Sequence, residues 1–283
     1  MFRNGKLINF FLVLAVLLTL SATSQANSIY RFNGSIFEPV AGSLSQVSVG
    51  ADGAAWGIDA NQQVFQLTRN GSGFSQIPGS LSQISVGNAS TVWGIDSASA
   101  VYRFDGSKLV SVPGSLTQIS AGSDGTVWGV DAANQVYRYN AGTRIFENVT
   151  GSLTSVSVGS ASAVWGIDQG SGQIYRYNPG TRLFVLVPGN YSAVSVGADG
   201  TAWAVSAGGQ VFRYNASSRL MQSVSGNLGS ISNGGGGNVW GVNGQSQVFR
   251  WQGSGFVMVP GSISQIDAGG SSMGSGSAWG VGP

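Results

Sequence analysis

The sequence contains no cysteine and no histidine, and its only glutamates are Glu38 and Glu147. Without cysteine the chain has no disulfides and no thiolate metal ligands. Without histidine it lacks the imidazole ligand and the side chain that most often transfers protons near neutral pH. Catalytic sets that combine serine or cysteine with histidine are therefore excluded, and an aspartate-based glycosidase is the remaining catalytic alternative. The composition predicts a protein that is not an enzyme and that requires no cofactor or metal.

Charge is also scarce, at 8% of the residues, and part of it lies in an N-terminal segment typical of a signal peptide. Arg3 and Lys6 precede an apolar run from Leu7 to Leu20, which is followed by the small and polar residues SATSQA. A membrane anchor requires about 20 apolar residues, so a secretory signal peptide explains the segment better. We predict a signal peptide at residues 1–26 and a secreted single domain at residues 27–283, extracellular or periplasmic and not membrane-spanning after cleavage.

The charge that remains after cleavage is balanced. Removing residues 1–26 takes away two of the 13 basic residues and none of the 11 acidic ones, which leaves 11 of each. The sequence has no cluster of lysine and arginine, and phosphate binding needs a basic surface. Nucleic acid is therefore excluded as a partner.

Glycine is abundant, with 45 residues, and a tryptophan-containing segment recurs along the whole domain. Its tryptophans follow one another at spacings of 37, 35, 37, 38, 37 and 39 residues, at Trp56, Trp93, Trp128, Trp165, Trp203, Trp240 and Trp279. Each unit contains four short β-type segments, which in the first unit are QVSVG, AAWGID, QVFQL and FSQIP. A regular period of this length with four strands per unit is typical of a β-propeller blade, and a β-solenoid is the alternative.

The turn residues fit this all-β interpretation. The first hairpin of alternate units contains a dipeptide that accepts the positive φ of a tight turn: Asp52-Gly53, Asp124-Gly125 and Asp199-Gly200. We interpret these aspartates as turn residues, because one carboxylate per hairpin is too few for a calcium site. A Pro-Gly pair follows the fourth segment in several units and predicts that this segment is the outer strand of each blade.

The ends of the domain contain complementary parts of one repeat. Residues 28–42 carry the third and fourth segments, and residues 264–282 carry the first two. Pairing these halves closes a ring and leaves no open edge at the termini. We therefore predict a propeller of seven four-stranded blades, the last one closed by two strands from each terminus. The six continuous blades are expected to begin near Ser45, Ser82, Thr117, Thr154, Ser192 and Gly229.

The segment VWGIDQGSGQIYRYN, from Val164 to Asn178, resembles the repeat of the tectonin family of β-propellers. The shared features are the Trp-Gly pair, the Asp three residues after the Trp and the aromatic-Arg pair, and the resemblance covers essentially all of residues 27–283. Members of this family are mostly carbohydrate-binding proteins of innate defence that recognise bacterial surface glycans, lipopolysaccharide or methylated sugars. The resemblance implies a lectin-like function. Tectonin lectins often have six blades, whereas the period here predicts seven.

The Trp-Gly pair has a packing explanation. The two-residue period of a strand places Trp56 and Ile58 on one face and Gly57 and Asp59 on the other. The tryptophan is suited to fill the space between blades, with its indole N–H bonded to backbone, and the glycine leaves room where a neighbouring blade approaches. The alternative is that the tryptophan edges contact sugar.

An arginine occupies the same position in six of the seven units, namely Arg31, Arg103, Arg138, Arg176, Arg213 and Arg250, with Gln66 as the exception. One explanation is an Arg-Asp or Arg-carbonyl bond that connects adjacent strands or blades. The other is that the guanidinium groups bind sugar hydroxyls or an anionic glycan group. A second set recurs in outer loops, either as solvated charges or as a rim that contacts anionic surfaces: Arg144, Arg182 and Arg219.

A ring and a polar residue follow the arginine in several units, and we predict that these positions bind ligand. Aromatic rings beside polar donors are a common way to bind a neutral sugar. The candidate ligand-binding residues are Arg103, Arg138, Tyr139, Asn140, Asp168, Arg176, Tyr177, Asn178, Arg213, Tyr214, Asn215, Arg250 and Trp251.

Together these observations predict a secreted, lectin-like protein whose near-equivalent blades bind bacterial-surface, methylated or anionic glycans multivalently. The expected partners are cell-surface glycans or lipopolysaccharide-like ligands. The alternative is an exported, non-catalytic propeller that serves as a scaffold for another exported protein. Repetition of aromatic and polar sets favours the lectin, but duplication of an ancestral unit produces the same repetition.

Overall fold

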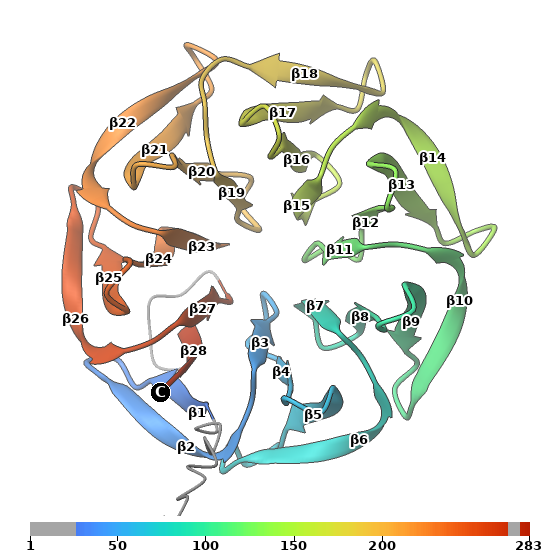
Figure 1. The fold of residues 1–283 in the computed structure, drawn as a ribbon, viewed down its shortest axis with the longest axis vertical. Coiled ribbons are helices and arrows are strands. Elements are labelled where there is room, and N and C mark those ends of the chain that lie inside the picture. The colour runs from blue at the N-terminus through green and yellow to red at the C-terminus, as the bar shows by residue number, and fades with distance from the viewer. Residues whose placement is uncertain (1–26, 271–277) are drawn as a thin grey trace, which may run out of the picture.

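The computed structural model describes residues 27–270 and 278–283, so the predicted signal peptide lies outside the described residues. Within this part of the chain, 28 β-strands form seven four-stranded antiparallel sheets. The sheets are arranged as blades in a ring, and the chain passes round it from blue to red (Figure 1). Residues of the innermost strands of all seven blades line a central channel. The structure confirms the predicted seven-bladed propeller and excludes the solenoid.

Each continuous blade is built from four successive strands, numbered here from the channel outward. Blade 1 contains β3 (Gln46–Val49), β4 (Ala55–Ile58), β5 (Gln63–Leu67) and β6 (Phe74–Ser80). Blade 2 contains β7 (Gln83–Asn88), β8 (Thr91–Ile95), β9 (Ala100–Phe104) and β10 (Leu109–Ser115). Blade 3 contains β11 (Gln118–Ala121), β12 (Val127–Val130), β13 (Gln135–Asn140) and β14 (Ile145–Ser152).

The second half of the ring repeats this order. Blade 4 contains β15 (Ser155–Ser160), β16 (Ala163–Asp168), β17 (Gln173–Asn178) and β18 (Leu183–Val187). Blade 5 contains β19 (Ala193–Val196), β20 (Ala202–Val205), β21 (Gln210–Asn215) and β22 (Leu220–Asn227). Blade 6 contains β23 (Ser230–Gly235), β24 (Asn238–Val242), β25 (Gln247–Trp251) and β26 (Phe256–Ser262).

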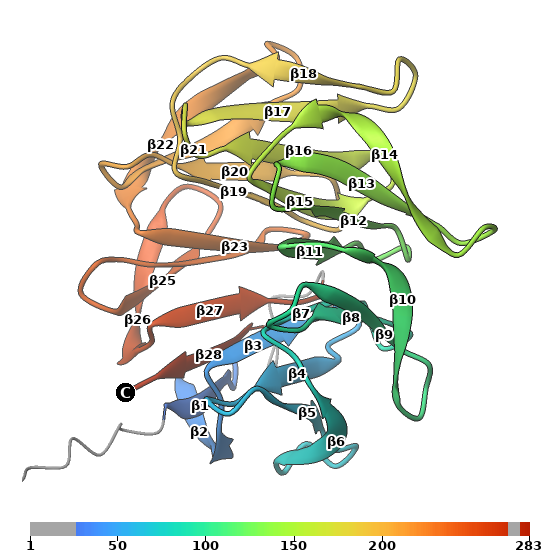
Figure 2. The ribbon, with the colours of Figure 1, turned by 45° about the vertical axis from the view of Figure 1, so that its right-hand side comes forward.

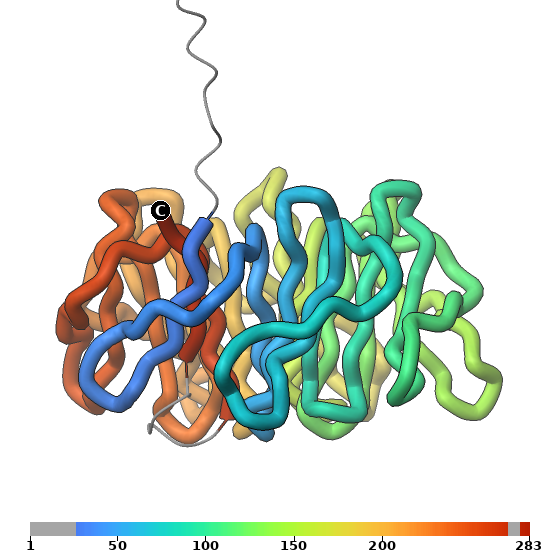
Figure 3. The backbone as a smooth tube through the Cα atoms, turned by 90° about the horizontal axis from the view of Figure 1, so that it is seen from below, coloured from blue at the N-terminus to red at the C-terminus, as the bar shows by residue number. Residues whose placement is uncertain are grey.

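Blade 7 combines the two ends of the domain. Its inner strands are β27 (Gln265–Ala268) and β28 (Ala278–Gly282), and its outer strands are β1 (Ser28–Phe32) and β2 (Phe37–Ser43). The junction is an antiparallel pairing of β1 with β28, which runs from Ser28 opposite Gly282 to Arg31 opposite Trp279. Seen from the side, the first and last strands lie together in one wall of the ring (Figure 3). The predicted closure is confirmed, and so are the starting points of the six continuous blades.

The tryptophans form the core between blades. Six of the seven are at most 2% exposed, and Trp93 is 5% exposed. Six meet a ring of the following blade nearly edge to face at 4.6–4.9 Å between centroids: Trp56–Phe104, Trp93–Tyr139, Trp128–Tyr177, Trp165–Tyr214, Trp203–Trp251 and Trp240–Phe32. This geometry suits the ring quadrupoles and confirms the packing explanation.

The hydrogen bonds predicted for the indole groups are wrong in four blades. Among the residues that the structure describes, the indole N–H groups of Trp56, Trp128 and Trp279 have no hydrogen-bond partner. That of Trp240 donates to the side chain of Asn238 at 2.7 Å instead of to backbone. The apolar space between the blades holds the ring in place while offering few acceptors.

In five blades the glycine after the tryptophan makes room for a leucine, and in blade 7 Gly280 makes room for Ile263. A Cβ added at Gly57 would collide with Leu44, which lies in the connection that enters blade 1, so the room serves this connection and not the neighbouring blade itself. Blade 5 shows the reciprocal change, because Ala204 replaces the glycine and Tyr191 replaces the leucine. The Tyr191 ring packs on Phe212 at 5.2 Å, which leaves space for the extra methyl group.

Side chains near the channel connect neighbouring blades. Gln118 Oε1 accepts the Val156 N–H at 2.9 Å and its Nε2 donates to the Val156 carbonyl at 3.0 Å. Equivalent glutamines extend from blades 7, 1 and 2, whereas Ser155, Ala193 and Ser230 occupy this position in blades 4, 5 and 6. The boundaries between blades 7 and 1, 1 and 2, 2 and 3, and 3 and 4 therefore share this glutamine link, which the other three boundaries lack.

The Asp-Gly hairpins contribute further links. Their glycines have positive φ values of 85°, 89° and 80°, as predicted for tight turns. Each aspartate caps its own turn and also accepts a backbone N–H of the next blade at 2.8 Å, in the pairs Asp52–Ala89, Asp124–Ala161 and Asp199–Gly236. The turn function is confirmed, and the link between blades is additional to it.

Candidate functional site

A groove of about 320 Å³ lies between blades 4 and 5. It is formed by β17, β18 and the hairpin between them, together with β21 and the hairpin that follows it. Figure 2 shows β18 next to β17, as the outer strand of blade 4. The lining residues are Arg176, Tyr177, Asn178, Pro179, Val185, Leu186, Val187, Tyr214 and Arg219. The groove thus brings together four of the predicted ligand-binding residues: Arg176, Tyr177, Asn178 and Tyr214.

The register of blade 4 determines which side chains reach the groove. Arg176 on β17 lies opposite Val185 on β18. At the end of β17, Asn178 Oδ1 accepts the Gly180 N–H at 2.9 Å and fixes the hairpin. Arg182 completes the hairpin with a φ of 58°, in the left-handed region, and donates its N–H to the Asn178 carbonyl at 2.8 Å. These bonds hold the polar end of the groove in one conformation.

The outer strand of blade 4 differs from most of its counterparts. Val185 and Leu186 are 51% and 45% exposed. The residue pairs at the same register positions of blades 1, 2, 3, 5, 6 and 7 are Ser75-Gln76, Val110-Ser111, Glu147-Asn148, Gln222-Ser223, Val257-Met258 and Glu38-Pro39. Blades 4 and 6 are therefore the two that present a pair of large apolar side chains here. Neighbouring residues of a strand point to opposite faces, so Val185 shares with Arg176 and Val187 the face toward blade 5. Leu186 shares with Phe184 the face toward blade 3. Val185 and Val187 form the apolar strip of the groove.

The charge of the groove is entirely positive. Arg176 and Arg219 are among its lining residues, and no aspartate or glutamate of the described chain lines it. The Arg176 guanidinium carbon lies 5.7 Å from the centroid of the Tyr214 ring, so the side chain extends from blade 4 across to blade 5. The groove combines an apolar strip with two planar cationic donors, which suits a ligand that has an apolar face and an acceptor-rich or anionic group.

The predicted rings are largely used in packing. Tyr177 and Trp251 are 5% and 8% exposed, and Tyr139 and Tyr214 are partly buried. Their edge-to-face contacts with tryptophans of the preceding blades account for this burial. In the groove, the exposed apolar surface on the face of Arg176 therefore comes mainly from Val185.

The arginines of the other blades show a contact that neither explanation from the sequence included. Their guanidinium carbons lie 5.4–5.9 Å from the centroid of the tryptophan across the strand pair, in Arg31–Trp279, Arg138–Trp128, Arg213–Trp203 and Arg250–Trp240. Arg31 also donates to the Gly71 carbonyl of blade 1 at 3.4 Å, which is an arginine–carbonyl bond between blades. Burial lowers the pKa of Arg250, and Arg103 is partly buried on β9. Cation–π contact thus covers the tryptophans at the blade boundaries.

Asn140, Asn215 and Asp168 are the last residues of their strands, where turns begin. Asn140 and Asn215 accept backbone N–H groups of their own outer hairpins at 2.9 Å. Asp168 lies in the turn at the opposite end of β17 from Asn178, where a hydrogen bond from the Ser171 hydroxyl lowers the pKa of its carboxyl group. Asp168 is not part of the groove lining.

Sequence reasoning did not select Val185, Leu186 or Arg219 for the site. The signal for the first two is visible once the fourth segments are aligned, because most blades have polar residues there. Arg219 belongs to the outer-loop arginines, and its position in the groove lining agrees with a rim that contacts anionic groups. The aligned repeat shows where one blade departs from the others, but only the fold shows that these departures meet Arg176.

Two searches of the described residues gave negative results. Residues 27–270 and 278–283 contain no cluster of three or more histidine, cysteine, aspartate or glutamate side chains suited to a metal ion. In the same part of the chain, no helix has the length and apolar character needed to cross a membrane.

Solved structures with the same architecture are similar to the chain in fold alone. Yeast RCC1, in a structure with Kap60, has a TM-score of 0.69 at 9% identity, over 92% of this chain and 89% of that one. Streptogramin B lyase has a TM-score of 0.65 at 13% identity, over 90% and 97%. YCF48 bound to D1 peptide has a TM-score of 0.60 at 13% identity, over 83% and 91%. One of these proteins is named as an enzyme and another as a peptide complex, so the propeller alone does not define an activity.

Sequence comparison is more specific. No curated protein matches the chain. The sequence model of the tectonin domain matches residues 18–102, 66–222, 173–248 and 218–283, which together span nearly the whole repeat region. With the repeat, the seven blades and this match in agreement, the chain belongs to the tectonin domain family.

Proposed function

We propose that this protein is an exported, non-catalytic glycan-binding propeller and that the groove between blades 4 and 5 is a binding site. The observation that carries the proposal is the juxtaposition of the exposed Val185, on the face toward blade 5, with the guanidinium groups of Arg176 and Arg219. The family match supports a lectin-type or scaffold role. Export rests on the signal-peptide pattern of residues 1–26.

A sugar ring has an apolar C–H face and a periphery of hydroxyl groups, and the groove offers a partner for each. Val185 provides surface for the C–H face or for a methyl substituent. Arg176, Arg219 and the amide of Asn178 provide donors for hydroxyl, carboxylate or phosphate oxygens. The ligands that fit this set are bacterial-surface, methylated or anionic glycans, including lipopolysaccharide-like ligands.

The number of sites is a separate part of the proposal. Blades 3 and 5 repeat the arginine and asparagine positions but have Glu147-Asn148 and Gln222-Ser223 in place of the apolar pair. We expect these blades to bind more weakly than the groove. Multivalent binding then depends on several weak sites that engage one surface together.

A glycan array tests the function directly. The purified protein should bind at least one methylated, anionic or lipopolysaccharide-derived glycan, and failure to bind any of them contradicts the proposal. The decisive variant replaces the apolar pair by the residues of blade 3, Val185→Glu with Leu186→Asn. It should reduce binding by about tenfold or more, because it removes the exposed Val185 side chain and places a carboxylate opposite Arg176. Arg219→Ala should reduce binding of anionic more than of neutral glycans.

The matched control changes the apolar pair of blade 6 in the same way, with Val257→Glu and Met258→Asn. These side chains are 48% and 55% exposed, so neither double variant should alter folding. Retained glycan binding in the control together with loss in the blade 4 variant places the site in the groove. Equal loss in both variants contradicts that location.

The apolar pair of blade 6 favours a second candidate function. Val257 and Met258 lie on the outer strand β26 and form an exposed apolar surface that a protein partner can cover. The protein is then an exported scaffold. In that case the blade 6 variant should abolish capture of a specific exported protein, while glycan binding is absent from the unmodified protein.

A further inference from the structure

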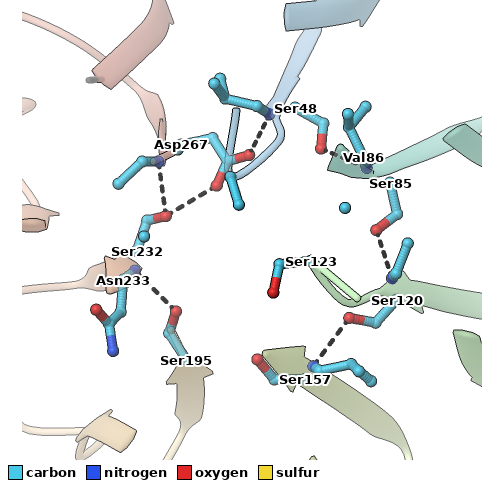
Figure 4. Close-up of a pocket in the computed structure, with 18 of the residues that line it drawn as sticks. Ser48, Ser85, Val86, Ser120, Ser123, Ser157, Ser195, Ser232, Asn233 and Asp267 are labelled. Atoms are coloured by element: carbon cyan, nitrogen blue, oxygen red, sulfur yellow. Dashed lines mark hydrogen bonds between the residues drawn. The ribbon is translucent and has the colours of Figure 1, made fainter. Parts of the chain in front are cut away.

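A ring of seven side chains surrounds the central channel, one from the innermost strand of each blade. Each accepts the backbone N–H of the next blade at 2.7–3.1 Å. The pairs are Ser48–Val86, Ser85–Ala121, Ser120–Val158, Ser157–Val196, Ser195–Asn233, Ser232–Ala268 and Asp267–Val49. Figure 4 shows these side chains around a polar cavity of about 250 Å³. Six of the seven positions are serine, and the seventh is Asp267.

Asp267 forms hydrogen bonds with the blades on both sides of its own. One carboxylate oxygen accepts the Val49 N–H of blade 1 at 2.7 Å, and the other accepts the Ser232 hydroxyl of blade 6 at 2.8 Å. The residue therefore joins three consecutive blades. It does so in blade 7, the blade built from both ends of the domain and the one whose assembly closes the ring.

Within the described residues, no positive charge compensates the carboxylate. The strands packed against β27 are β28, β3, β23 and β24, and none of them carries a titratable residue. The hairpin after β3 carries Asp52, whose carboxylate oxygens accept the N–H groups of Ala54 and Ala89. Among the described residues that line the channel cavity, Asp267 is the single acidic residue, and none is basic. A desolvated carboxylate without a cation is costly, even when it accepts several hydrogen bonds.

We propose that Asp267 makes the closure of the ring respond to pH, holding blade 7 most firmly to blades 1 and 6 when its carboxyl group is protonated. Protonation removes the uncompensated charge but leaves a carbonyl oxygen to accept the Val49 N–H. Deprotonation restores the charge and weakens the attachment of blade 7 to blades 1 and 6. A serine at this position, as in the other six blades, has no such dependence.

The pKa of the Asp267 carboxyl group supports greater stability at low pH. Burial is the largest effect and raises the pKa of Asp267 to about 6, although hydrogen bonds from Val49 and Ser232 act in the opposite sense. Because the folded protein holds this proton more tightly than the unfolded chain does, the contribution to stability is fully present below about pH 4. It is lost progressively as the pH rises through about 6.

Thermal unfolding of the full chain and of two variants tests the proposal. Asp267→Asn keeps an acceptor for Val49 without a titrating group, and Asp267→Ser installs the residue of the other blades. The midpoint of unfolding of the unmodified protein should fall by roughly 5 °C more between about pH 4.5 and 7.5 than that of either variant. Equal pH dependence in all three proteins overturns the proposal.

Hydrogen exchange gives a local readout that does not depend on either variant. After correction for intrinsic rates, protection of the Val49 amide should fall about tenfold or more from about pH 4.5 to 7.5. The Val158 amide, which is bonded to Ser120 on another part of the ring, should change much less. If both amides lose protection to the same extent, Asp267 does not control the closure and the proposal is wrong.

Discussion

The two boundaries of blade 4 differ in how they are held and in what they expose. Four side chains of blade 3 form hydrogen bonds across the boundary with blade 4, namely Gln118, Ser120, Ser123 and Asp124. In the described part of the chain, the boundary between blades 4 and 5 has a single such bond, from the Val196 N–H to Ser157. The groove with its apolar strip lies at this second boundary.

The two boundaries of blade 4 share their apolar packing and differ in their polar contacts. Both boundaries contain a buried tryptophan in edge-to-face contact with the next blade, so the apolar core is common to them. The glutamine and Asp-Gly links, in contrast, vary from blade to blade. A boundary with few links can change its surface residues with little effect on its neighbours, which suits it to carry a binding site.

Removing the shared core should have the largest effect on stability. Trp128→Ala and Trp165→Ala should each lower the free energy of unfolding by about 3–5 kcal/mol, because both leave a large cavity between blades. Urea denaturation followed by circular dichroism measures the loss. A cost below about 1 kcal/mol at either boundary would show that the tryptophans are not its main support.

Removing a link from the stronger boundary should have an intermediate effect. Gln118→Ala eliminates both hydrogen bonds to Val156 and leaves its buried backbone N–H without this acceptor, at a cost of about 1–3 kcal/mol. Denaturation midpoints measure the change, with Gln222→Ala on the exposed outer strand as the control. Equal midpoints for both variants would contradict the role of the glutamine.

Adding a link to the weaker boundary should have the smallest effect. Ser155→Gln places a glutamine where blades 1, 2, 3 and 7 already have one, with the backbone of Val194 as its expected partner. We expect a gain of about 0.5–1 kcal/mol, the net value of a typical hydrogen bond after loss of side-chain freedom. A destabilised variant would indicate that the weaker boundary cannot accommodate the longer side chain.

The fold was predictable because each repeat contains the residues that specify its strands and turns. The tryptophan period, the Asp-Gly hairpins and the complementary ends specify strands, turns and closure through local residues. The link made by Asp124 was not predictable, since the turn residues show that it caps a hairpin but not that Ala161 of the next blade lies within 2.8 Å. The indole bonds were predicted wrongly, because the acceptors available between blades depend on their packing.

The candidate site was predictable only in part. The sequence identified Arg176, Tyr177, Asn178 and Tyr214 as members of a repeated set, and it gave the same weight to their counterparts in other blades. It did not distinguish the rings that pack from those with free surface, because both kinds alternate in the same way along a strand.

The sequence by itself therefore determined the number of blades, their strand order and their closure, since each depends on short-range periodicity repeated seven times. Only the tertiary structure decided which of the non-equivalent residues come into contact. Arg176 and Arg219 are far apart in the chain, and they line one groove because adjacent blades present their outer hairpins side by side. Asp267 and Val49 meet for the same reason, because ring closure brings the two ends of the domain into contact.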